Sequence, residues 1–183
     1  MSTSPLRAFI ALDVDEGARE RLVGLLQRLA GEVPGVRWVR AEGLHVTVRF
    51  LGWTDAAVLG RIEDAVAPAA RDCAPAQAAL GPLGLFPERG SPRVLWVGLD
   101  LPPRMHALQR ACEQAARHEG FEPEERAFRP HVTLGRWKDR ARRPVLPAPD
   151  LGTAHVTQLT LYRSELRPSG AVYTPLHRFD LGR

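Results

Sequence analysis

Two short segments of the chain place a threonine two residues after a histidine. The first pair is His45 and Thr47, and the second is His131 and Thr133, 86 positions further along (131 minus 45). Both pairs lie in apolar, β-branched runs that end at a glycine, which is typical of a strand. Because residues two apart in a strand point to the same face, each histidine shares a face with its threonine. One such motif arises readily by chance, whereas two in matched strand contexts indicate a common purpose.

The residue types in these motifs are suited to acid–base chemistry. Histidine titrates near neutral pH, so one neutral and one protonated imidazole can deprotonate a nucleophile and protonate a leaving group in the same displacement. The hydroxyls of Thr47 and Thr133 can donate hydrogen bonds to an anionic oxygen held between them. This set is sufficient for a metal-free attack on a phosphodiester. The sequence does not decide which of His45 and His131 gives the proton and which takes it.

Three arginines near the motifs are candidates for neutralising a phosphate, because the planar guanidinium donates two hydrogen bonds at once. Strand alternation predicts that Arg49 shares the face of Thr47 and that Arg129 shares the face of His131. Arg129 is the stronger candidate, since an aromatic residue and a proline flank it. Arg136 alternates away from His131, although a turn at Gly135 would redirect it. A solvated or salt-bridged arginine is the alternative for each.

The paired motifs and the strands around them resemble the two-histidine phosphoesterase superfamily, and most closely its RNA 2′,3′-cyclic phosphodiesterase branch, historically called 2′-5′ RNA ligases. The resemblance is carried by the motif segments 44–52 and 128–136 and, beyond them, by residues 7–12, Trp38-Val39, 161–166, Gly170 and Tyr173. The resemblance implies hydrolysis of 2′,3′-cyclic phosphate ends of RNA or oligonucleotides to 2′-phosphomonoesters. It also implies that His45 is the general acid on the departing ribose oxygen, that His131 is the general base on water, and that Thr47 and Thr133 hold phosphate oxygens.

Two aromatic residues are further candidates for contact with RNA. Phe9 can stack on a base, although most phenylalanines in such strands belong to the core. Trp137 opens the basic segment 137–143 and can also stack on a base, with a solvated loop as the alternative. We expect no metal and no other cofactor, because two histidines and two threonines do not make a zinc set and no carboxylate cluster adjoins them. The sequence also lacks a Gly-x-x-x-x-Gly-Lys phosphate loop, so ATP dependence is not expected.

The elements that must position these residues follow from hydrophobic periodicity. We predict helices at 15–30, at 54 to about 68 and at 102–118, and strands at 7–13, 36–39, 44–51, 76–85, 93–99, 130–135, 156–166 and 171–181. The order strand, helix, motif strand occurs at 7–52 and again at 93–136. We therefore expect a single α+β domain over 1–183. It would have two pseudo-symmetric lobes, each an antiparallel or mixed sheet backed by helices, with a central groove.

Composition allows this reading without proving it. With 183 residues, 44% hydrophobic and 25% charged, the chain is an ordinary globular sequence. No apolar run approaches the ~20 residues that cross a bilayer, and we expect a cytoplasmic monomer. The net charge of +4 permits a polyanionic partner, but the arginine excess is explained at least as well by compositional bias, since only Lys138 among the 25 basic residues is a lysine. Two alternative functions remain: joining or cleaving 2′-5′ linkages in tRNA halves, and a non-catalytic RNA-end binding module.

Overall fold

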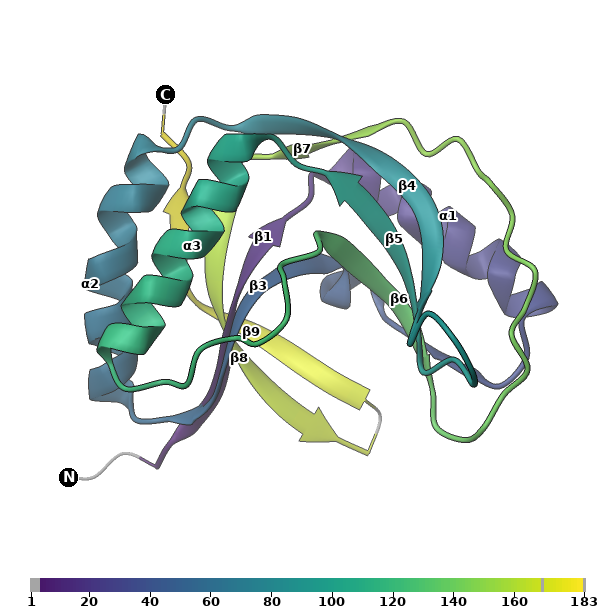
Figure 1. Ribbon diagram of the computed structural model, residues 1–183, viewed down its shortest axis with the longest axis horizontal. Helices are drawn as coiled ribbons and strands as arrows, with labels where there is room; N and C mark the ends of the chain where they lie inside the picture. Colours follow the sequence, from purple (N-terminus) through teal and green to yellow (C-terminus); the bar gives the residue numbers. More distant parts are fainter. Residues whose placement is uncertain (1–3, 169, 183) are drawn as a thin grey trace.

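The computed structural model describes residues 4–168 and 170–182 (Figure 1). The elements follow one another in this order: β1 (Leu6–Asp13), α1 (Glu16–Glu32), β2 (Val36–Trp38), a short 3-10 turn (Ala41–Gly43), β3 (His45–Thr54), α2 (Ala56–Asp72), β4 (Ala76–Phe86), β5 (Val94–Asp100), α3 (Pro103–His118), β6 (His131–Trp137), β7 (Thr153–Val156), β8 (Gln158–Arg167) and β9 (Gly170–Asp180).

The helices begin where local chemistry predicts. The Asp15 side chain accepts a hydrogen bond from the Ala18 N–H at 3.3 Å and so caps α1. Pro103 opens α3, at a position where the missing N–H costs nothing. The prediction that α2 fades near Pro68 is wrong, because the helix continues to Asp72. Val66 and Ala70, each 1% exposed, pack the last turns against the core and outweigh the hydrogen bond lost at the proline.

The described strands form one nine-stranded sheet in the order β7-β4-β5-β6-β3-β1-β8-β9, and β2 pairs with β6 outside that path. Every pairing is antiparallel. The two halves, β1-β3-β8-β9 and β4-β5-β6-β7, meet where β3 pairs with β6 through the single residue pair Val46 and Val132. The α+β expectation is confirmed. The halves share one continuous sheet rather than each forming a separate one.

The repeated order of strand, helix and motif strand appears as β1-α1-β3 and β5-α3-β6. Each helix crosses to the other half: α1 contacts β2 and β7, whereas α3 contacts α2 and β3. In Figure 1, α2 and α3 lie side by side at one end of the molecule and α1 lies at the opposite end, with the curled sheet between them. Leu22 and Leu25 of α1, Ile62 of α2 and Met105 of α3 are buried in the core that these helices form with the sheet. No helix among the described residues is long and apolar enough to span a bilayer.

Candidate active site

The pairing of β3 with β6 brings the two motifs together. Val46 opposes Val132, and both side chains are completely buried. Continuing that antiparallel register by one residue places His45 towards Thr133 and Thr47 towards His131. Because side chains alternate along a strand, all four motif side chains emerge on the face opposite the two valines. The fold therefore gathers both histidines and both threonines around one point on the sheet, although they come from different halves of the chain.

The hydrogen bond made by His131 determines its tautomer. Its Nδ1 lies 2.6 Å from the carbonyl oxygen of Arg129, which can only accept, so Nδ1 carries the hydrogen. In the neutral ring this leaves Nε2 as an acceptor. Burial lowers the pKa of His131, the hydrogen bond to Arg129 opposes that effect, and the charges of Arg136 and Arg129 lower it further. His131 therefore offers an unprotonated nitrogen at neutral pH, which is what a general base requires.

Aromatic rings hold His131 in place. Its ring centroid lies 5.2 Å from that of Phe86 and 5.9 Å from that of Trp96, and these two rings stack on each other at 4.9 Å. The sequence does not point to Phe86 or Trp96 as site residues, because their approach to His131 depends on the pairing of β4, β5 and β6.

His45 lies in a more enclosed aromatic setting. Its ring stacks on Phe9 with centroids 4.9 Å apart, faces Tyr162 at 5.8 Å and meets the edge of Tyr173 at 5.2 Å. Its Nδ1 is buried, and no hydrogen-bond partner for it exists among residues 4–168 and 170–182. Burial, and then the charge of Arg19, lower the pKa of His45 to about 4. His45 is therefore neutral in the free protein, and an anion placed beside it would favour its protonation.

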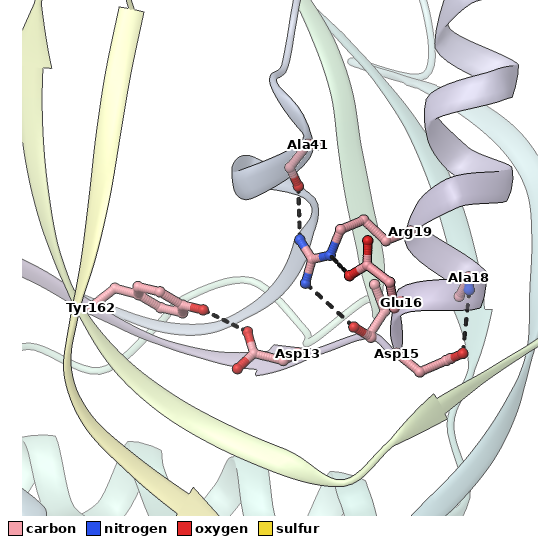
Figure 2. Close-up of polar contacts among 8 residues, drawn as sticks. Asp13, Asp15, Glu16, Ala18, Arg19, Ala41 and Tyr162 are labelled. Carbon is pink, nitrogen blue, oxygen red and sulfur yellow. Dashed lines mark hydrogen bonds and ion pairs between the residues drawn. The ribbon is translucent and has the colours of Figure 1, made fainter.

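A polar network supports the ring of Tyr162 next to His45 (Figure 2). Asp13, the neighbour of His45 across β1 and β3, accepts a hydrogen bond from the Tyr162 hydroxyl at 2.8 Å, which Figure 2 draws. It also accepts a hydrogen bond from the Thr160 hydroxyl at 2.6 Å. Burial and the nearby Asp13 carboxylate raise the pKa of Tyr162, so the phenol stays protonated and keeps donating. This bond fixes the orientation of one wall of the His45 site.

Arg19 brings the positive charge that acts on His45. Its guanidinium donates to the Ala41 carbonyl at 2.7 Å, and its Nε lies 3.4 Å from a carboxylate oxygen of Glu16 (Figure 2). Arg19 comes from the first turn of α1, whereas Ala41 lies in the turn directly before β3. The contact therefore ties the start of the first motif strand to α1.

Both motif strands contain a β-bulge at the third residue after the histidine. In β3 the register against β1 skips Val48, and in β6 the register against β5 skips Leu134. One extra residue inverts the alternation of side chains beyond it. The fourth residue after each histidine therefore turns away from the motif face, and the fifth residue, Phe50 or Arg136, returns to it.

This inversion corrects two predictions from strand alternation. Arg49 is 7% exposed; its Nε lies 3.0 Å from a carboxylate oxygen of Glu113 in α3, and it also donates to the Glu122 carbonyl. Its predicted placement beside Thr47 is wrong, and the reason for assigning it to phosphate is lost. Arg136 is exposed and close enough to His131 to lower its pKa, so the prediction that it points away is also wrong. Phe50, 52% exposed, occupies the place expected for Arg49.

Arg129 lies beside His131, as predicted. Its guanidinium carbon is 5.1 Å from the ring centroid of Phe86 and 5.6 Å from that of Trp96, within the range of cation–π contacts. Its Nη1 also forms an ion pair with Glu88 at 2.5 Å. The side chain is half exposed, which leaves its guanidinium accessible to a ligand. Its assignment to substrate binding remains a prediction.

Burial contradicts the prediction that Phe9 and Trp137 stack on a base. Phe9 is 2% exposed and lies among the rings of His45, Phe50, Tyr162 and Tyr173, so it packs against the His45 ring. Trp137 is 6% exposed, and its indole N–H donates to the Pro34 carbonyl at 3.1 Å. Neither ring has a free face for a nucleotide. Within the described part of the chain, no three His, Cys, Asp or Glu side chains gather as a metal site.

Comparisons with known proteins agree with this geometry. The chain is 34% identical over 183 residues to the RNA 2′,3′-cyclic phosphodiesterase of Methanothermobacter thermautotrophicus, covering 96% of this chain and 99% of that protein. It is 32% identical over 182 residues to the protein of the same name from Archaeoglobus fulgidus, covering 96% of this chain and 100% of that one.

Solved structures match over nearly the full length. TT0787 of Thermus thermophilus superposes with a TM-score of 0.83 at 31% identity, covering 97% of this chain and 99% of that one. The structure of E. coli LigT complexed with 3′-AMP gives a TM-score of 0.84 at 28% identity, covering 98% and 99%. Residues 14–167 match the 2′-5′ RNA ligase superfamily. Together with the paired motifs on adjacent strands, this match shows that the chain belongs to that superfamily.

Proposed function

We propose that this protein hydrolyses the 2′,3′-cyclic phosphate ends of RNA or oligonucleotides and leaves 2′-phosphomonoesters. The observation that carries the proposal is the pairing of β3 with β6, which sets His45 and His131 on one face while the Arg129 carbonyl leaves Nε2 of His131 as an acceptor. The relatives named RNA 2′,3′-cyclic phosphodiesterase support the substrate class.

The reaction requires one proton to be taken and one to be given. Nε2 of His131 accepts a proton from water as the water oxygen attacks phosphorus, and the bond between phosphorus and O3′ breaks. His45 delivers its proton to O3′, which leaves as the free ribose hydroxyl. The hydroxyls of Thr47 and Thr133 donate to the non-bridging oxygens, where negative charge increases in the transition state. Proton exchange with solvent then restores both imidazoles.

The low pKa of His45 couples its protonation to substrate binding. In the free protein burial and Arg19 keep the ring neutral. A cyclic phosphodiester carries a negative charge, and an opposite charge within a few ångströms raises the pKa of an imidazole. His45 therefore takes up its proton as the substrate anion binds, and the protonated imidazole that acts as the acid forms only in the complex with substrate. Because both histidines come from one chain, a monomer suffices for this mechanism.

The experiment is to assay His45→Ala and His131→Ala separately on an oligonucleotide ending in a 2′,3′-cyclic phosphate, in the presence of a chelator. Removal of a general acid or base typically costs about 10²–10⁴-fold, so each variant should lose at least about 100-fold in kcat. Near-native turnover by either variant would refute the two-histidine mechanism. A wild-type product that carries a 3′-phosphate would refute the predicted direction of ring opening. A non-catalytic binding module would instead bind the oligonucleotide with no turnover in the wild type.

A further inference from the structure

Two arginines lie directly opposite each other beside the His131 half of the site. Arg37 of β2 and Arg136 of β6 are partners across an antiparallel pair, and both are exposed. Side chains at directly opposed positions lie on the same face, with Cβ atoms about 4.5–5.5 Å apart. Two guanidinium groups therefore extend from neighbouring points of the sheet.

The face that these arginines occupy is the motif face. Val36 and Trp38, which flank Arg37, pack against the core, so Arg37 points to the other side. Trp137, next to Arg136, is buried in the core, and the bulge at Leu134 returns Arg136 to the side of His131. The charge of Arg136 acts on His131, which agrees with this placement of the two side chains.

Both arginines keep their hydrogen-bond donors available. Across the described residues, Arg37 and Arg136 form no side-chain hydrogen bond and no ion pair, whereas Arg129 on the same half pairs with Glu88. Like charges at directly opposed positions destabilise a sheet. A pair of unneutralised, exposed guanidinium groups beside an active site is what binding of an external anion requires, because the planar fork of arginine matches the oxygens of a phosphate.

The position of the pair along the strand suggests which phosphate it binds. On β5, Trp96 opposes Thr133 and Val94 opposes Arg136, so Arg136 lies two residues of β5 beyond Thr133. At about 3.4 Å per residue this is about 7 Å, and β2 places Arg37 about 4.8 Å to the side of β6. A substrate whose reacting phosphate accepts from Thr133 would therefore have its next phosphate within reach of these two long side chains. In an RNA ending in a 2′,3′-cyclic phosphate, the neighbouring phosphate is the one on the 5′ oxygen of the same terminal nucleotide.

We propose that Arg37 and Arg136 form a second phosphate subsite, which binds the 5′ phosphate of the nucleotide that carries the cyclic end. The subsite rests on the proposed function, since its ligand is identified by its position relative to the reacting phosphate at His45 and His131. It makes the enzyme prefer a terminal nucleotide linked through its 5′ phosphate over an isolated nucleoside cyclic phosphate.

The test compares two small substrates: a nucleoside 2′,3′-cyclic phosphate with a free 5′ hydroxyl, and the same compound with a 5′ phosphate. Hydrogen bonds to charged groups are worth enough for the wild type to show at least about tenfold higher kcat/KM on the 5′-phosphorylated compound. Arg37→Ala should reduce that ratio severalfold, since only Arg136 then remains, and Arg37→Lys, which keeps the charge but loses the fork, should give an intermediate ratio. The matched control is Arg28→Ala, which removes the same charge from the exposed face of α1 and should leave the ratio at its wild-type value.

Salt dependence gives a second readout. Salt screens the attraction between an exposed guanidinium and the 5′ phosphate, so Arg37→Ala should weaken the salt dependence of kcat/KM for the 5′-phosphorylated compound and leave that for the 5′-hydroxyl compound unchanged. A wild-type ratio near one, or a ratio retained in Arg37→Ala, would overturn the subsite while leaving the cyclic phosphodiesterase assignment intact. No turnover of either compound by a wild type that opens the cyclic end of an oligonucleotide would overturn the subsite alone, and no turnover of the oligonucleotide as well would overturn the assignment with it.

Discussion

The environment of His45 predicts that the protein loses stability as the pH falls below the ordinary pKa of histidine. In the unfolded chain this ring takes up a proton near pH 6.5, whereas in the folded protein its pKa is lowered to about 4. Between these values the unfolded state binds more protons than the native state, so the free energy of unfolding decreases with decreasing pH. The stabilisation is complete above pH 6.5 and is lost progressively down to about pH 4.

The size of the effect follows from the two pKa values. Each tenfold change in a proton-dissociation constant is worth about 1.4 kcal/mol. The difference between 6.5 and about 4 therefore gives a loss of about 3 kcal/mol once both states are protonated, and of about 2 kcal/mol between pH 7.5 and pH 5. An exposed histidine has the same pKa in the folded and unfolded states and therefore adds nothing to the pH dependence of stability.

The assay is urea unfolding of the wild type and of His45→Gln at pH 7.5, 6.5, 5.5 and 5. Glutamine removes the titration while keeping a polar side chain of similar length. Carboxylates and the other histidines titrate equally in both proteins, so the difference between the two stability curves isolates His45. We expect the wild type to lose about 2 kcal/mol more than the variant over this range. Two parallel curves would show that His45 is not held neutral by the fold, and the proposed uptake of a proton with substrate would lose its basis.

Three further predictions concern the residues around the motifs. Arg49→Met should lower the free energy of unfolding by about 3 kcal/mol in denaturant, because it leaves the poorly solvated Glu113 carboxylate without its ion-pair partner. KM should stay within about twofold of the wild type. A raised KM with unchanged stability would place Arg49 in the substrate site after all. Phe9→Ala should cost about 3 kcal/mol through the cavity it leaves and should also reduce kcat, since His45 loses its stacking partner; a normal kcat in the folded variant would contradict that support. A 2′-nucleotide product should bind more tightly as the pH is lowered from 8 to 6, measured by calorimetry, and His45→Gln should remove most of this dependence.

Local chemistry in the sequence determined the positions of the helices and the faces of the motifs. Asp15 and Pro103 mark helix starts by capping and by a missing N–H, which act within a few residues and can be read from the chain alone. The alternation of side chains predicted for His45–Thr47 and His131–Thr133 is also found in the structure, because these three residues come before the bulge in each strand.

Only the tertiary structure decided what lies beyond those three residues. The bulges at Val48 and Leu134 exist because β1 and β5 impose their own registers, and no residue type at these positions marks them. They reverse the faces of Arg49 and Arg136. Likewise, the burial of Phe9 and Trp137 depends on residues that other segments bring close. Alternation is a property of one strand, whereas register and burial depend on the set of strands packed around it.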